Sequence, residues 1–244
     1  MCCPWFIEGR WPSYISPMFN PQLLGTHPAL SLRTSPPGAA GHRWRVSLLA
    51  TMCALPVVAQ AQAQAADTRR YGIEVAGLRV GTMTATRQPQ AGSDLIYSLI
   101  SDVQVNFLFY HLKIYYKVVN RVHNGQLLLS TVEAHTNQGD FASRTEWKGD
   151  HYDIVAEQYK YHYLATEPRP ITYTVTDLFF SEPVGRPKAF AEYFGDYFTL
   201  SRGADLIYRA HRDGREDEYQ YANGQLVTII KKNPLKNFII RRLP

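Results

Sequence analysis

Residues 107–122 alternate between apolar and polar side chains, and this period of two constrains the fold more than any other feature of the chain. Successive side chains of a β-strand point to opposite faces, so the pattern predicts a half-buried strand that bends or pairs in two places. The two faces are Leu108, Tyr110, Leu112, Ile114, Tyr116 and Val118 on one side, and His111, Lys113, Lys117 and Arg121 on the other.

Similar short runs continue from about residue 70 and are separated by dipeptides that tolerate positive φ. These turns are Asn124-Gly125, Gly139-Asp140, Gly149-Asp150, Asp213-Gly214 and Asn223-Gly224. They delimit strand-like runs at residues 126–136, 141–148, 151–163, 205–212, 216–222 and 225–232. Hairpins of this spacing are typical of a sandwich, a barrel or a curved meander.

Two stretches break the rhythm. Residues 165–170 contain two prolines and predict a loop, and residues 175–180 predict one helical turn whose Phe179 and Phe180 plug the sheet. The predicted fold is therefore all-β: a strongly curved antiparallel sheet or incomplete barrel of about ten to twelve strands with one short helical turn.

The first 65 residues differ from the rest. Residues 42–65 have a basic start, an uncharged run and an Ala-x-Ala pattern, which is the order of a secretory signal peptide. The run is shorter than the roughly 20 residues of a membrane-spanning helix, so we expect cleavage. We interpret residues 1–41 as a disordered leader or an upstream translation start, and residues 66–244 as a single domain. That domain would be exported, periplasmic or in the cell envelope, and would not span the membrane.

Charge and cysteine content exclude several classes of function. From residue 66 onward the chain has 22 basic and 20 acidic residues, and this net charge of +2 gives no argument for nucleic-acid binding. All three cysteines precede residue 66, so no disulfide or thiolate chemistry is expected in the domain. No metal, cofactor or nucleophile motif occurs, and we expect neither a metal nor a cofactor.

Two acidic constellations, at residues 192–198 and 213–219, have more than one interpretation. The candidate polar residues are Glu192, Asp196, Arg215, Glu216 and Glu218. Their carboxylates are candidates for acid–base catalysis. The alternatives are a solvated hairpin flank at residues 213–219 and a buried ion pair at residues 192–198, with Arg209 or Arg215 as the partner.

Tyrosine is abundant, and 15 of the 16 tyrosines follow residue 66. A ring with a polar tip suits the wall of an amphipathic cavity, and it equally suits an ordinary sheet surface. On the cavity interpretation, the candidate ligand-binding residues are Leu108, Tyr110, Leu112, Ile114, Tyr116, Tyr161, Tyr193, Tyr219 and Tyr221.

Five segments carry a resemblance to a known family: residues 76–81, 178–183, 191–197, 213–219 and 231–240. From residue 71 to 243 the chain resembles an uncharacterised family of exported bacterial proteins, a domain of unknown function. More loosely, it is similar to the curved-sheet carriers of lipoproteins and lipids. The resemblance implies export and a β fold, and it carries over no catalytic residue.

The leading hypothesis is a non-enzymatic protein that binds an amphipathic or lipid-like molecule on its concave aromatic face. A hydrolase that uses the carboxylates is the first alternative. The second is an envelope scaffold that offers an edge strand, or the basic residues 231–244, to a partner. The sequence leaves the ligand, the strand order and the oligomeric state open.

Overall fold

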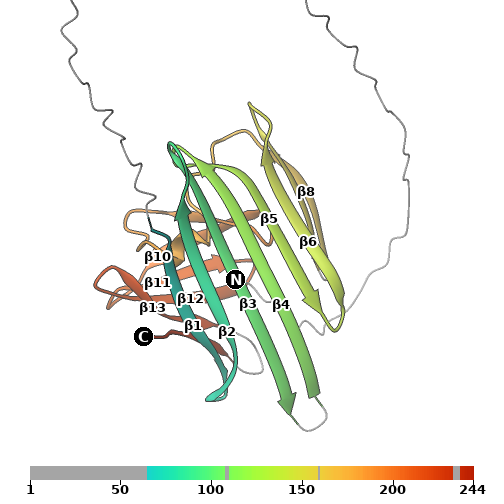
Figure 1. Ribbon diagram of the computed structural model, residues 1–244, viewed down its shortest axis with the longest axis vertical. Coiled ribbons are helices and arrows are strands. Elements are labelled where there is room, and N and C mark those ends of the chain that lie inside the picture. The colour runs from blue at the N-terminus through green and yellow to red at the C-terminus, as the bar shows by residue number, and fades with distance from the viewer. Residues whose placement is uncertain (1–64, 108–109, 159, 233–236) are drawn as a thin grey trace, which may run out of the picture. The chain divides into compact units, whose positions relative to one another are not determined.

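The computed structural model describes residues 65–107, 110–158, 160–232 and 237–244. Within these ranges, fourteen antiparallel strands form one sheet, and one 3₁₀ turn separates its two halves along the chain (Figure 1). Residues 1–64 of the predicted leader and signal peptide lie outside the described residues, so that division of the chain stays a prediction.

The first half of the sheet is a meander of eight strands. It comprises β1 (Asp67–Val75), β2 (Leu78–Pro89), β3 (Asp94–Phe107), β4 (Tyr110–His123), β5 (Gln126–Thr136), β6 (Gly139–Trp147), β7 (Tyr152–Gln158) and β8 (Tyr161–Glu167). In β4, Ile114, Tyr116 and Val118 are buried, while Lys113 is exposed and Lys117 is half-buried. The half-buried strand predicted from the alternation is therefore confirmed, and it begins at Tyr110.

The second half follows the 3₁₀ turn η1 (Asp177–Phe179). It comprises β9 (Lys188–Ala191), β10 (Asp196–Arg202), β11 (Ile207–Arg212), β12 (Arg215–Ala222), β13 (Gln225–Lys231) and β14 (Phe238–Arg242). β14 pairs with β1, so the order across the sheet runs from β8 down to β1, then from β14 down to β9. The all-β class and the single curved sheet agree with the prediction from the sequence.

The predicted number of ten to twelve strands was too low, and residues 151–163 illustrate the reason. The sequence predicted one strand there, but the structure has the hairpin β7–β8, whose strands pair from Gln158 with Tyr161 onward. Lys160 adopts a φ of 55° in this turn. A lysine at positive φ is uncommon and leaves no glycine or asparagine signal in the sequence.

The two edge strands of the sheet, β8 and β9, differ in whether another segment pairs with their outer side. Residues 173–175 run parallel to β9 and cover its edge, because Val175 N donates to Phe190 O at 2.8 Å and Phe190 N donates to Tyr173 O at 2.9 Å. β8 pairs with β7 alone among the described strands. The sheet is thus an incomplete barrel with one covered edge and one open edge.

The two halves of the sheet share one hydrophobic core. In Figure 1, β10–β13 run across behind the long strands β1–β4. Tyr71 of β1 contacts Phe179 of η1 with ring centroids 5.5 Å apart, and Tyr97 of β3 contacts Phe180 at the same distance. Both phenylalanines are buried, so the predicted helical turn with its two rings closes over the core.

Candidate functional site

The two ends of the sheet approach each other without forming a ladder: the inner face of β7–β8 packs against the turn that joins β9 to β10. We call this contact the seam, and its main members are Ile154, Tyr161 and Tyr163 on one side and Phe194 and Gly195 on the other. Among the described residues no backbone hydrogen bond crosses it. Side chains alone therefore hold the incomplete barrel closed at this place.

Gly195 lets the turn approach β7 closely. The turn is tight, since Phe194 N and Gly195 N both donate to Ala191 O, at 3.0 and 2.9 Å. Gly195 has a φ of +67°, and a Cβ added there would lie 2.4 Å from Ile154 Cγ2. Gly195 therefore lies in a turn between strands, where the side chains of β7 and β8 leave no room for a Cβ.

Tyr161 joins the two sides of the seam. Its hydroxyl donates to Phe194 O at 3.1 Å, and its ring meets the Phe194 ring edge-on with centroids 5.4 Å apart. Arg212 Nη2 in turn donates to the Tyr161 hydroxyl at 3.0 Å. Burial raises the pKa of Tyr161, and the positive charge of Arg212 opposes that rise, so the phenol remains a neutral donor.

Two arginines lie over the same aromatic ring. Arg212 and Arg215 face each other across the β11–β12 turn, and their guanidinium carbons lie 4.6 and 5.1 Å from the centre of Phe194. Arg212 has an 11% exposed side chain and pairs with Asp196 at 3.1 Å. For Arg215, none of the described carboxylates lies within ion-pair distance. Arg215 is thus a cation at the seam that none of the described acids neutralises directly.

Behind Phe194 lies the interior of the sheet. A hollow of about 10 Å³, enough for about one water molecule, is lined by Phe194 and Glu192 together with apolar residues of β3, β4 and β10. A second hollow of about 20 Å³ lies between Met83, Phe238 and Lys231. The inner face beside these hollows is filled with side chains.

Glu192 is the buried acid of this region, with 4% of its surface exposed. Its Oε1 accepts hydrogen bonds from Asn120 Nδ2 at 2.8 Å and from Thr176 N at 3.0 Å. Thr174 lies between Asn120 and Asp177, and its hydroxyl donates to Asp177 Oδ2 at 2.9 Å. Burial raises the pKa of Asp177 to about 6, and the nearby Glu192 charge adds to the rise. The two acids therefore belong to one polar cluster, in which Glu192 is buried and Asp177 is partly buried.

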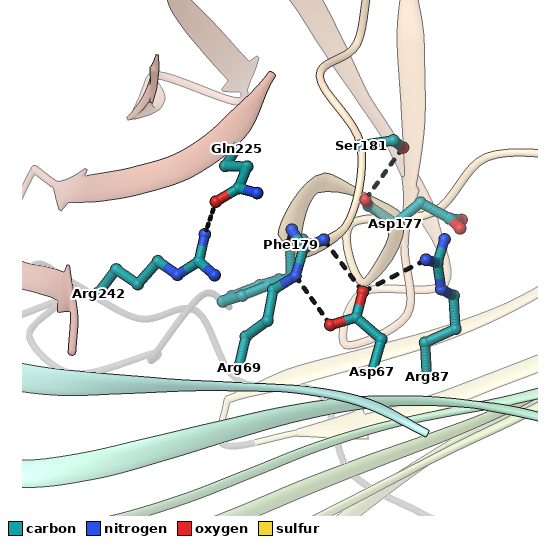
Figure 2. A network of polar contacts seen from close by, with 8 residues as sticks. All are labelled: Asp67, Arg69, Arg87, Asp177, Phe179, Ser181, Gln225 and Arg242. Atoms are coloured by element: carbon teal, nitrogen blue, oxygen red, sulfur yellow. Dashed lines mark hydrogen bonds and ion pairs between the residues drawn. The ribbon is translucent and has the colours of Figure 1, made fainter. Parts of the chain in front are cut away.

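A second polar network fastens η1 to β1 and β2. Figure 2 shows Asp67 between Arg69 and Arg87, whose Nη2 atoms lie 3.0 and 3.2 Å from Asp67 Oδ2. Arg69 Nη1 also donates to Phe179 O at 2.8 Å, and both guanidinium groups lie over the Phe180 ring. These side chains bind one another and the backbone of η1, which indicates a structural role.

The comparisons with known proteins identify the family. A family model with the description "Domain of unknown function (DUF6134)" matches residues 71–243. The chain belongs to the DUF6134 family. Its similarity to an uncharacterised family, stated from the sequence, is thereby confirmed.

The comparison of the DUF6134 chain with curated proteins gave no match. Among solved structures, it is similar to a beta-barrel-like protein of domain of unknown function DUF1849 from Brucella abortus, with 8% identity and a TM-score of 0.42. The match covers 72% of this chain and 95% of the Brucella chain.

The structure separates the predicted ligand-binding residues of this DUF6134 domain. Tyr161 lies at the seam, Leu108 lies outside the described residues, and Tyr110 and Leu112 belong to β4. The others are buried in one hydrophobic core cluster, in which the ring of Tyr193 contacts those of Tyr116 and Phe194: Ile114, Tyr116, Tyr193, Tyr219 and Tyr221. Ligand binding by these core residues stays a prediction.

The four acids proposed for a hydrolase do not come together. Glu192 is buried inside the sheet and Asp196 pairs with Arg212. Glu216 and Glu218 lie on the outer face of β12, where Lys232 pairs with both. Between them in sequence, Asp217 faces inward and forms a buried ion pair with Lys231 at 2.6 Å.

Sequence reasoning did not single out Ile154 or Arg212, and it included Phe194 in the constellation at residues 192–198 without giving it a role. For the alternative of a buried ion pair at residues 192–198, Arg209 or Arg215 was the candidate partner, but the partly exposed Asp196 pairs with Arg212. Asp213-Gly214 closes a two-residue turn, which places residues 212 and 215 opposite each other. This Asp-Gly turn signal is present in the sequence.

Among the described residues, no cluster of three or more His, Cys, Asp or Glu is suited to a metal, and no helix is long and apolar enough to cross a bilayer.

Proposed function

We propose that this domain binds an anionic amphiphile, a molecule with an acyl chain and a carboxylate or phosphate head group, in the periplasm or cell envelope. Arg215 carries the proposal, because it stacks on Phe194 at the seam without a carboxylate partner among the described residues. A guanidinium group is a planar two-point donor to carboxylates and phosphates. Residues 42–65 support the location, since they have the order of a signal peptide.

The seam offers the acyl chain a way into the sheet. Side chains alone close it, so its opening breaks no hydrogen bond of the β-ladder. Leu99, Val118 and Phe198 lie beside Phe194 and provide an apolar wall. Because the hollow there is water-sized, the chain enters only when the Phe194 ring moves outward. Arg215 then exchanges its contact with the ring for a hydrogen-bonded ion pair with the head group.

Binding of three matched probes tests the proposal. Dodecanoate and dodecyl phosphate should bind the full chain in isothermal titration below their micelle concentrations, and the uncharged dodecanol should bind much more weakly. Arg215→Ala should weaken dodecanoate binding about 10- to 100-fold, the equivalent of one charged hydrogen-bonded contact. Arg186→Ala is the matched control, because Arg186 also stacks on a ring, that of Tyr173, away from the seam.

Two outcomes would contradict the proposal. One is equal binding of dodecanol and dodecanoate, which would remove the role of the cation. The other is an equal effect of Arg215→Ala and Arg186→Ala, which would remove the role of the seam. Native mass spectrometry of protein purified without detergent adds an independent measurement, in which an anionic lipid mass should appear with the wild-type chain and be depleted in Arg215→Ala.

A further inference from the structure

The open edge of the sheet, β8, presents alternate backbone groups to solvent. Gln158 and Tyr161 close the β7–β8 hairpin and form its first hydrogen-bonded pair, so Ala156 pairs with Tyr163 and Ile154 with Ala165 in the same way. The N–H and C=O groups of residues 162, 164 and 166 therefore point away from β7. Among the described residues, none of these groups has a backbone partner.

Within the described part of the chain, β8 also lacks the features that usually protect an edge strand. Such edges are commonly guarded by lysines, by prolines within the strand, by a bulge or by a covering segment. In β8, residues 161–166 contain no Lys, Arg, Asp, Glu or Pro, and Glu167 is the last residue of the strand. Leu164 is 63% exposed and lies directly opposite Val155 of β7, which is 38% exposed. The edge is therefore extended, weakly charged and apolar at its centre.

We propose that β8 pairs with β8 of a second copy of this chain. In an antiparallel arrangement with a two-fold axis at Leu164, residues 162, 164 and 166 of one copy face residues 166, 164 and 162 of the other. These three pairs exchange about six N–H···O hydrogen bonds by the pattern of an antiparallel ladder. The two sheets then join into one continuous sheet through an isologous contact.

The side chains of β8 fit a second copy of themselves in this register. Leu164 meets Leu164 on the outer face, beside Val155 of each copy. His162 meets Thr166, whose side chain carries no charge. On the inner face Tyr163 meets Ala165, and Tyr161 meets Glu167, which Arg169 already neutralises at 2.8 Å. No like charges oppose each other, so the edge is complementary to itself.

The expected dimer is reversible. An interface of one short ladder and a small apolar patch lies at the lower end of specific interfaces, so the mass should rise with protein concentration. The pairing does not depend on Arg215 or on the ligand proposed above, so either proposal can fail alone.

Sedimentation velocity of the full chain across a wide concentration series provides the first test. The wild-type chain should shift from monomer to dimer as its concentration rises. Leu164→Lys should remain monomeric, because two lysines would face each other at the axis. Leu78→Lys is the matched control: Leu78 is 62% exposed, on the β1–β2 hairpin, and its substitution should leave the dimer intact.

Hydrogen exchange tests the register. On dimerisation the amides of residues 162, 164 and 166 should gain protection, while those of 161, 163 and 165, already bonded to β7, should change little. A monomer at every concentration would overturn the proposal. So would a dimer that Leu164→Lys leaves unchanged, or an edge protected by a different co-purified protein.

Discussion

Asp177 is a carboxylic acid whose surroundings disfavour its charge. Burial raises its pKa to about 6, and although hydrogen bonds from Thr174 and Tyr97 oppose the rise, Glu192 contributes to it. The folded state therefore holds this proton more tightly than the unfolded chain does, where the ordinary value is 3.8. The stability that this group contributes is complete below the ordinary pKa and is lost as the pH rises through about 6.

Asp177→Asn should therefore stabilise the protein at neutral pH and have little effect in acid. The amide keeps an acceptor for Thr174 and removes the buried charge. At pH values above the folded-state pKa, the free energy of unfolding should increase by up to about 3 kcal/mol. Each pKa unit of the shift corresponds to about 1.4 kcal/mol. Urea denaturation of both proteins over a pH series measures the difference, and a gain that does not vary with pH would contradict this explanation.

The hairpin turns show which elements the sequence predicts well. Asn124, Asp213 and Asn223 each adopt a positive φ and precede a glycine that does the same, as their dipeptides predict. Leu206 and Lys160 also adopt positive φ, and neither residue type signals it. The sequence thus located these three hairpins. It placed the β5–β6 turn two residues late, at Gly139-Asp140, which begin β6, and it merged β7 with β8 where no turn signature is present.

The site was less predictable than the fold. Tyr161, Asp196 and Arg215 were all selected from the sequence, but for separate reasons and with other partners. They come together because the sheet curls until the β11–β12 turn and the β9–β10 turn meet β8. That contact joins segments from three hairpins, and the period of two within each strand carries no information about it.

Gly195→Ala tests whether the seam needs close contact with β7. The substitution should lower the free energy of unfolding by ~1 kcal/mol through the positive φ, and by a further ~1–3 kcal/mol through the clash with Ile154. Gly185→Ala is the matched control, because its φ is +68° but no atom lies within 4 Å of the added Cβ. Chemical denaturation of both variants gives the difference, and equal losses would show that the contact contributes nothing.

In the whole domain, the pairing of β1 with β14 joins the two halves of the sheet. They form the only ladder between the first eight strands and the last six among the described residues. The core crosses the same boundary, since Tyr71, Leu99, Phe198 and Tyr219 belong to one cluster. The two halves should therefore unfold together in a single transition.

Ile240→Ala tests this cooperativity. Ile240 is buried in β14 between Ile73 of β1 and Ile229 of β13, so its truncation should lower the free energy of unfolding by about 3 kcal/mol. Hydrogen exchange should show equal losses in β3–β5 and in β10–β12. Ile239→Ala, at a half-buried position on the other face of β14, should cost only about 1 kcal/mol. Separate transitions for the two halves would contradict a single cooperative unit.

The β1–β14 ladder also sets the order of events when the chain folds. Tyr71 pairs with Arg242, so the strand synthesised early must wait for the one synthesised late. Until then, β1 has an unpaired side, and the aromatic residues of the core lack half of their neighbours. Contacts of such long sequence separation are formed slowly and leave an aggregation-prone intermediate. We therefore expect the nascent chain to be prone to aggregation until β14 has been synthesised.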